Sequence, residues 1–373
     1  MIQQLTAACI VGALSLVCAA APASAPAADR PEYLVGVYYF AGWWPGLPNK
    51  WQTDGRDWRP DWPDRIPALG EYNEQAVMDR EIAAAADHGI DFFQILYYCQ
   101  RPGAPTQPHE EMLNVGLDQF MASPNSARMK FTIEVVNHAP FDAPEIEEWR
   151  AACMVWARAM QHPSYLRIDG RPVFKIHGYD WFLKGAGRKV EVAKERLNLL
   201  RSIVREAGSG EIMLSAGVMP MEIPEGPLAS EFDFFTTYMA VPPLAARAAP
   251  YPYTKLTEDA ENGWNNQIRK NPHHYVPYLA AGWDPRPWKV PSPSFTMPTR
   301  AEWTDALQRA KRALDTEPRL GVPTRTGRQK MLLIYAWNEF GEGGILAPTR
   351  NGGTMKLEAI RAVFRGSSHR PLP

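Results

Sequence analysis

The sequence predicts a (β/α)8 barrel, because strand-like and helix-like segments alternate along most of its 373 residues. Eight strand-like runs can be counted from about residue 33 onward, with helical patterns between them. The last run ends in two glutamates, and barrels of this class carry their chemistry at the C-terminal ends of their strands. An open doubly wound sheet is the alternative. It would require a glycine-rich phosphate loop after the first strand, and residues 41–46, AGWWPG, do not form one.

The predicted strands are apolar runs, which is typical of strands that are buried on both faces. They are expected at residues 34–40, 90–98, 130–136, 172–177, 211–217, 232–239, 275–281 and 331–337.

The predicted helices show apolar residues at helical spacing between these runs. They are expected at residues 74–88, 110–121, 145–160, 189–207, 257–269, 301–315 and 355–364. After the fifth strand only residues 224–230 are available for a helix. Long loops follow strands one, six and seven, at residues 41–73, 241–256 and 282–299. Loops of this length are usually functional, and all three would open on the face that carries the two glutamates.

Composition limits the classes of partner. The formal net charge is -1, which gives no electrostatic reason to expect nucleic acid or an anionic membrane. The chain has 13 Trp, 14 Tyr and 14 Phe, and many of them lie in segments rich in Gly and Pro. Aromatic rings in loops beside carboxylates suit a carbohydrate site, because the apolar faces of sugars stack on rings.

The N-terminus reads as a secretory signal peptide over residues 1–27. Residues 5–20 are apolar but too short to span a bilayer, and Ala25-Pro26-Ala27 fits a cleavage site before Ala28. No Lys or Arg precedes the apolar core, so an unusually apolar leader is the alternative. We therefore expect a secreted or periplasmic protein with one domain at 28–366 and a flexible tail at 367–373. Cys99 and Cys153 would remain after cleavage, and two free buried thiols are expected.

The eighth strand leads into Glu339 and Glu342, which lie three positions apart in a glycine-containing turn. Glycoside hydrolysis needs one carboxyl group as acid and another as base or nucleophile, and neighbouring carboxyls can take these different states. Alternation with period two places Tyr335, Trp337 and Glu339 on one side of the strand. If that side faces the barrel axis, Glu339 enters a pocket above Trp337. The alternative is that Glu342 caps the next segment and Glu339 pairs with an Arg.

The run Trp337-Asn338-Glu339-Phe340-Gly341-Glu342-Gly343, followed by Pro348, resembles a known signature. It is similar to the W-N-E-W-x-E-G…P motif of the GH99 endo-α-mannosidases and endomannanases, and to the related WbsX-type proteins. Residues 36–44, 69–72, 162–165 and 168–174 also resemble segments of these proteins. Phe340 stands where the family has Trp, and Gly341 stands where the GH99 enzymes have His. Residues 134–138, EVVNH, differ from the W-A-N-E-like ending of strand three in WbsX-type proteins.

The resemblance implies a (β/α)8 barrel and retaining hydrolysis of α-mannosidic linkages without a metal or other cofactor. It also implies roles for the two carboxyl groups. Glu339 would act as base on the sugar 2-hydroxyl, which attacks the anomeric carbon and gives a 1,2-anhydro sugar. Glu342 would protonate the leaving oxygen and then activate water.

Polar and aromatic residues at the predicted strand ends and in the long loops are candidate sugar contacts. They are Tyr39, Trp43, Trp44, Glu71, Tyr98, Asn137, His138, His177, Tyr179, Tyr238, Trp283, Asp284, Trp337 and Asn338. For any one histidine a structural role is the alternative, and Glu71 could instead cap the first helix. Glu134 lies deep in its strand and would need a partner.

Two other classes of protein compete with a hydrolase of this kind. A metal-dependent hydrolase could use His138, His177 and Asp284, although residues 35–40 lack the H-x-H pair common in such barrels. A catalytically silent glycan-binding or polysaccharide-biosynthesis protein is the other. The preferred prediction is a glycoside hydrolase with a carbohydrate substrate, no cofactor and no nucleic-acid partner. It would have no membrane-spanning segment in the mature chain and would be a monomer.

Overall fold

The computed structural model describes residues 31–99, 110–142 and 145–366. The predicted signal peptide at 1–27 and the predicted tail at 367–373 lie outside these residues. By its internal contacts the chain divides into Met1–Pro31 and Glu32–Pro373, and the barrel belongs to the second unit.

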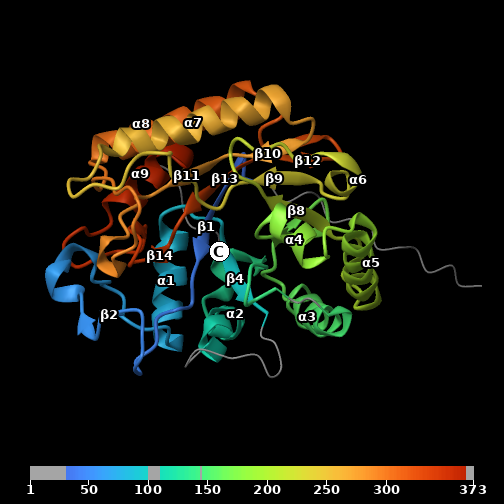
Figure 1. Cartoon of the computed structure of the whole chain (residues 1–373), viewed down its shortest axis with the longest axis horizontal. Helices are drawn as coiled ribbons and strands as arrows, with labels where there is room; N and C mark the ends of the chain where they lie inside the picture. The colour runs from blue at the N-terminus through green and yellow to red at the C-terminus, as the bar shows by residue number, and fades with distance from the viewer. Residues whose placement is uncertain (1–30, 100–109, 143–144, 367–373) are drawn as a thin grey trace, which may run out of the picture. The chain divides into compact units, whose positions relative to one another are not determined.

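Eight parallel strand positions close into a barrel, so the predicted fold class is confirmed (Figure 1). In chain order the strands are β1 (Tyr33–Tyr39), β4 (Phe92–Tyr98), β5 (Lys130–Val136), β7 (Arg171–Ile176), β8 (Met213–Gly217), β9 (Phe234–Thr236), β10 (His274–Val276) with β11 (Tyr278–Ala280), and β13 (Gly327–Tyr335). The seventh position consists of two pieces because Pro277 has no N–H to donate. β10 pairs with β9, β11 pairs with β13, and β13 pairs with β1, which completes the ring.

Helices surround the strands, each lying close to its predicted place (Figure 1). They are α1 (Gln75–Asp87), α2 (Val115–Ala122), α3 (Ile146–Ala159), α5 (Val190–Glu206), α7 (Tyr253–Lys270), α8 (Arg300–Thr316) and α9 (Met355–Phe364). Only the short α6 (Gly226–Ala229) follows β8, as expected. α4 (Tyr179–Gly185) was not predicted. It begins directly after β7 and brings Trp181 to the barrel mouth.

The long loops contain short elements that sequence patterns did not predict. The first loop holds the hairpin of β2 (Gln52–Thr53) with β3 (Arg56–Asp57) and the 3-10 turns η1 (Arg59–Asp61) and η2 (Pro63–Arg65). After β13 a second hairpin pairs β14 (Asn338–Glu339) with β15 (Gly344–Ile345). The remaining short elements are β6 (Arg167–Ile168), β12 (Val322–Thr324), η3 (Glu110–Asn114), η4 (Ser126–Arg128) and η5 (Arg286–Trp288).

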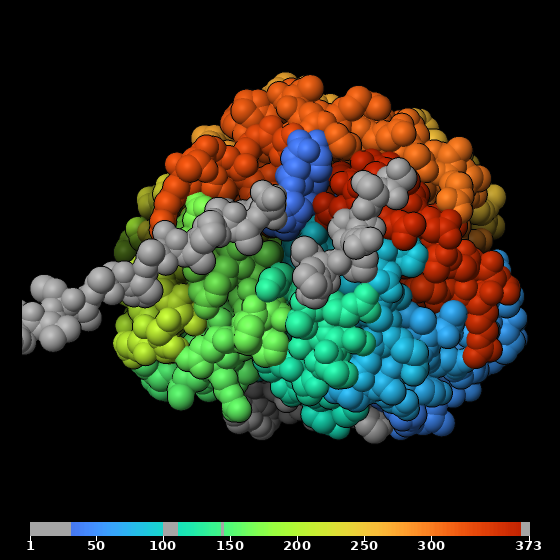
Figure 2. All heavy atoms as spheres, turned by 180° about the vertical axis from the view of Figure 1, so that it is seen from behind, coloured from blue at the N-terminus to red at the C-terminus, as the bar shows by residue number. Residues whose placement is uncertain are grey.

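The C-terminal helices cover the beginning of β1 at the closed end of the barrel. Seen from behind, this segment lies between α8 and α9 (Figure 2). The Tyr33 hydroxyl donates a hydrogen bond to Asp315 of α8, and its ring meets Phe364 of α9 edge to face. These contacts attach the first strand to the last helices, so the barrel is secured at the end opposite the candidate site.

Two further predictions can be compared with the described residues. Cys99 and Cys153 are both buried and free, as expected. No helix in the described part of the chain is long and apolar enough to cross a membrane.

Candidate active site

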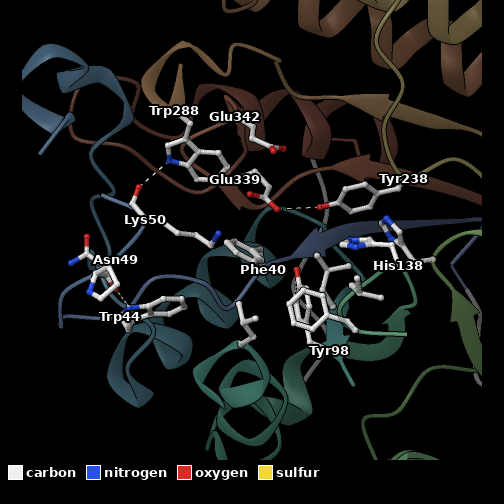
Figure 3. Close-up of a pocket in the computed structure, with 16 residues that line it drawn as sticks. Phe40, Trp44, Asn49, Lys50, Tyr98, His138, Tyr238, Trp288, Glu339 and Glu342 are labelled. Atoms are coloured by element: carbon white, nitrogen blue, oxygen red, sulfur yellow. Dashed lines mark hydrogen bonds between the residues drawn. The ribbon is translucent and has the colours of Figure 1, made fainter. Parts of the chain in front are cut away.

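The hairpin that follows β13 places both predicted catalytic glutamates in a cavity of about 550 Å³ at the barrel mouth (Figure 3). Its tight turn needs two of its glycines. Gly343 has φ +84°, a conformation that L side chains rarely adopt. A Cβ on Gly341 would lie 2.0 Å from the Trp288 ring, so only glycine lets the indole pack there. The sequence therefore shapes this turn around a neighbouring aromatic side chain.

Glu339 is a buried acid with one neutral hydrogen-bond donor. Its side chain is 5% exposed, and the Tyr238 hydroxyl donates to Oε1 over 3.1 Å. Burial, followed by the negative charge of Glu342, raises the pKa of Glu339 to about 8, while Lys50 opposes this shift. In this arrangement Glu339 therefore holds a proton at neutral pH.

Glu342, three residues further along the chain, lines the same cavity and accepts a hydrogen bond from the Tyr335 hydroxyl. Burial raises the pKa of Glu342 as well, and the Tyr335 hydrogen bond and the charge of Lys50 oppose this rise. Two neighbouring acids titrate as a pair, so the first proton lost belongs to both. The arrangement gives one carboxylic acid and one carboxylate near pH 7, which acid–base catalysis at a glycosidic bond requires.

A second buried carboxylate, Glu134, does not line the cavity and has a lysine and a histidine as partners. Lys175 Nζ is 2.9 Å from Oε1 of Glu134, and His177 Nδ1 is 2.5 Å from the same oxygen. Although burial alone would raise it, Lys175 and His177 hold the pKa of Glu134 below its ordinary value. The prediction that this residue would need a partner is confirmed. The contact also fixes the His177 ring, which lines the cavity.

Aromatic side chains form a large part of the remaining wall, as expected for a carbohydrate site. Phe40, Trp44, Tyr98, Phe141, Tyr238 and Trp288 line the cavity. A second cavity of about 640 Å³ shares His177, Tyr238 and Glu342 with the first. There the Trp181 ring stacks on His177 at an interplanar angle of 8° and remains 41% exposed. The two cavities thus meet at Glu342.

The structure brings together nine of the predicted site residues. Those that line the first cavity are Trp44, Tyr98, His138, His177, Tyr238, Glu339 and Glu342. Tyr179 and Trp283 line the second cavity. They come from strands and loops far apart in the chain, which is what closure of a barrel produces.

Two aromatic candidates lie outside the cavity, and their predicted positions are wrong. The Tyr39 hydroxyl donates to Glu81 Oε2 of α1 over 2.8 Å, so this side chain faces the helix layer. Trp337 is fully buried and packs on Phe93, whose ring also contacts α2. β13 ends at Tyr335, so alternation with period two no longer holds at Trp337. Trp337 is therefore not the floor of the pocket.

Three further candidates support the site from outside through hydrogen bonds. The Asn338 side chain accepts from Phe40 N over 2.9 Å and donates to Phe40 O over 2.8 Å. Trp43 donates from Nε1 to Asn338 O over 2.9 Å. Asn137 bonds in the same two-sided way to the backbone of Gly178. These residues join the loops after neighbouring strands and do not line either cavity.

The remaining two candidates form ion pairs away from the cavity. Glu71 pairs with Arg59 and Arg350, so it neither contacts the cavity nor caps α1, whose N-cap residue is Glu74. Asp284 is 3% exposed and pairs with Arg65 and Arg286 in a separate cavity. The three suggested metal ligands are consequently not brought together. Among the described residues no group of three or more His, Cys, Asp or Glu side chains is placed to hold a metal ion.

Sequence reasoning did not select Lys50, Trp288, Tyr335 or Lys175 as site residues. Lys50 and Trp288 lie in the first and third long loops, which were predicted to open on the site, but loop length does not specify a side chain. Tyr335 was placed on the side of the strand that carries Glu339, and this alternation could have indicated it. Lys175 has no signal of its own, because its role depends on Glu134 in the neighbouring strand.

Comparisons with known proteins show the family and support the fold. The sequence model of the family described as "Glycosyltransferase WbsX" matches residues 61–360. A solved structure called a glycoside hydrolase-like protein is similar, with a TM-score of 0.59 and 16% identity over 92% of this chain and 97% of that one. The GH99 endo-alpha-mannosidase from Bacteroides thetaiotaomicron has a TM-score of 0.51 and 15% identity, over 88% of this chain and 95% of that one. No curated protein sequence matches the chain.

Proposed function

We propose that this chain, which belongs to the WbsX glycosyltransferase family, is a glycoside hydrolase acting through Glu339 and Glu342. Its fold is similar to that of a GH99 protein. One observation carries the proposal. One buried and one half-buried acid, each hydrogen-bonded to a tyrosine, share one cavity that six aromatic side chains also line. Carbohydrate is the substrate that suits such walls.

The proposed reaction retains the configuration at the anomeric carbon and follows the roles that the family resemblance implies. The sugar 2-hydroxyl donates a hydrogen bond to Glu339, which favours the charged form of that carboxyl. The proton that Glu339 holds in the free enzyme then moves to Glu342, which lies next to the leaving oxygen. Glu339 takes the proton of the 2-hydroxyl while the oxygen of that hydroxyl attacks the anomeric carbon. Glu342 protonates the leaving oxygen. Glu342 then takes a proton from water, which attacks the anomeric carbon and opens the 1,2-anhydro sugar, and Glu339 returns its proton to O2.

The test is release of reducing ends from a panel of α-mannans and other bacterial, plant and algal glycans. For any glycan that is cleaved, Glu342→Gln should lower kcat/KM about 10²- to 10⁴-fold, because it removes the proton donor. Glu261→Gln is the matched control, since that carboxyl lies on α7 and pairs with Arg309. Equal losses in both variants, or normal turnover in Glu342→Gln, would refute the assignment.

The family description supports a second candidate, transfer of a sugar to another glycan. An intermediate opened by water can also be opened by a sugar hydroxyl. Incubation of a cleavable glycan with an excess of labelled acceptor distinguishes the two. Labelled, elongated product at the expense of free reducing ends favours transfer. Glycan binding without either product would favour a silent binding protein.

We also propose that the protein is exported and that its signal peptide is removed by cleavage before Ala28. The alanine-rich segment at residues 19–28, with its A-x-A pattern, supports this. N-terminal sequencing of the protein recovered from the periplasm or medium should begin at Ala28. Recovery of the uncleaved chain from the cytoplasm would contradict export.

A further inference from the structure

Lys50 brings a positive charge to a cavity that already holds two acids. Among the described residues that line this cavity, Lys50 is the one lysine or arginine. It comes from the first long loop and extends into the cavity (Figure 3). Any role of Lys50 toward a substrate rests on the proposed function, because it concerns the same site.

The position of Lys50 is fixed by contacts to its backbone. Its carbonyl oxygen accepts hydrogen bonds from the indole N–H of Trp58 over 2.8 Å and of Trp288 over 2.9 Å. Its side chain then runs between two rings, with Nζ 5.3 Å from the centroid of Phe40 and 5.2 Å from that of Trp288. Two indoles and two ring faces thus hold the ammonium group at the cavity wall.

The ammonium group has donors to offer to a ligand. A lysine has three N–H donors, and aromatic faces attract its charge without supplying a lone pair. Within the described residues, no carboxylate oxygen lies within 4.0 Å of Lys50 Nζ, and the side chain makes no hydrogen bond. Lys175 in the same barrel differs, since it donates to both Glu134 and Tyr38.

The charge balance of the cavity indicates what Lys50 can bind. With one proton shared, Glu339 and Glu342 carry a single negative charge that repels any anionic sugar. Lys50 offsets that charge, and its free donors can make charge-assisted hydrogen bonds, which are stronger than those to neutral oxygens. With a singly charged acid bound, the two glutamates, Lys50 and the ligand together carry one negative charge, and with a dianionic phosphate they carry two. A singly charged acid is therefore repelled less.

We propose that the site takes an acidic glycan, in which a sugar next to the cleaved bond carries a carboxylate or a sulfate ester bound by Lys50. The neutral rings of that glycan pack on the aromatic wall, and the acidic group separates it from neutral mannans. Lys50 is therefore a specificity-determining residue for the proposed hydrolase.

The test measures binding in the Glu342→Gln background, so that no substrate is consumed. The probes are oligosaccharides of a uronic-acid polymer with their carboxyl-reduced counterparts, and a sulfated oligosaccharide with its desulfated counterpart. In at least one pair we expect the acidic member to bind roughly tenfold more tightly than the neutral member. With Lys50→Met added, the acidic and neutral members should bind equally. With Lys50→Arg in its place, much of the preference for the acidic member should return. The pair that shows the ratio identifies the acid.

Lys289→Met is the matched control, because Lys289 is an exposed lysine beside Trp288 that pairs with Asp54. It should leave the ratio unchanged. Equal binding of acidic and neutral members, or a ratio that survives Lys50→Met, would overturn the inference, as would the absence of binding to every acidic probe. Lys50 would then act only as a counter-ion of the two glutamates. An acidic preference without cleavage of any glycan would instead refute the hydrolase and leave the inference standing.

Discussion

Glu134 and Glu339 are both buried carboxyls of one barrel, yet Glu134 is charged at neutral pH whereas Glu339 holds a proton. Glu134 contacts Lys175 and His177, and its pKa lies below the ordinary value despite burial. Glu339 faces another acid, and its pKa is raised to about 8. Burial is common to both, so the neighbours decide the difference. A compensated carboxyl stabilises the fold, whereas an uncompensated one stores a proton for chemistry.

The largest expected effect comes from removing the positive charge beside Glu134. Lys175→Met should leave Glu134 charged and buried without its main partner, which costs about 3–5 kcal/mol in the free energy of unfolding. Urea unfolding followed by circular dichroism measures this loss. Adding Glu134→Gln to Lys175→Met should recover much of it, because the stranded charge is gone. A loss below about 1 kcal/mol in the single variant would show that water already screens this pair.

Replacing Glu339 by a neutral residue should instead raise the free energy of unfolding above neutral pH. The folded-state pKa of Glu339 is raised from 4.5 to about 8, so its contribution to stability is present below pH 4.5. That contribution is lost as pH rises through 8. Relative to Glu339→Gln, wild type should lose up to about 3–5 kcal/mol between about pH 5 and pH 9. Urea unfolding at several pH values measures the difference, and parallel curves for the two proteins would contradict the raised pKa.

The difference between local patterns and long-range contacts explains which parts of the site the sequence could predict. The barrel and its eight strand positions follow from apolar runs, because a buried strand leaves a strong local pattern. Glu339 and Glu342 were found because strand ends in a barrel converge. Contacts between loops left no such pattern. Asp284 looked like a site residue, but Arg65 from the first loop pairs with it. Lys50 was missed because nothing in its neighbours along the chain shows that its side chain enters the cavity.

Trp337 shows a different limit. The alternation rule assumes that a strand continues, and β13 stops at Tyr335. Beyond that residue the backbone turns into the β14–β15 hairpin, so Trp337 packs against Phe93 while Glu339 still reaches the cavity. The position of a strand end depends on tertiary contacts and is the least reliable part of a sequence-based prediction.

A smaller effect is expected from the tyrosine that bonds to Glu342. Tyr335→Phe removes the hydroxyl that stabilises the charged form, so the pKa of Glu342 should rise further. If Glu342 is the acid, the alkaline limb of the kcat/KM profile moves to higher pH. We expect a loss of about 1.5–3 kcal/mol in transition-state stabilisation, as for a hydrogen bond to a charged group. A shift of the acidic limb instead would indicate that Glu342 is the base.

The smallest effect is expected from Tyr238→Phe, which removes the 3.1 Å hydrogen bond to Glu339 and leaves that acid surrounded by the same cavity. The Tyr238 hydroxyl also opposes the rise in the pKa of Glu339, so its removal should raise that pKa. If Glu339 is the base, it must lose its proton before the 2-hydroxyl can attack, and the acidic limb should move to higher pH. The cost at the optimum should be about 0.5–1.5 kcal/mol, because Glu339 holds its proton in the free enzyme and the hydrogen bond then joins two neutral groups. The two tyrosine variants should therefore move opposite limbs of one pH profile. If both move the same limb, the carboxyls do not have separate roles, and the division into base and acid/base is wrong.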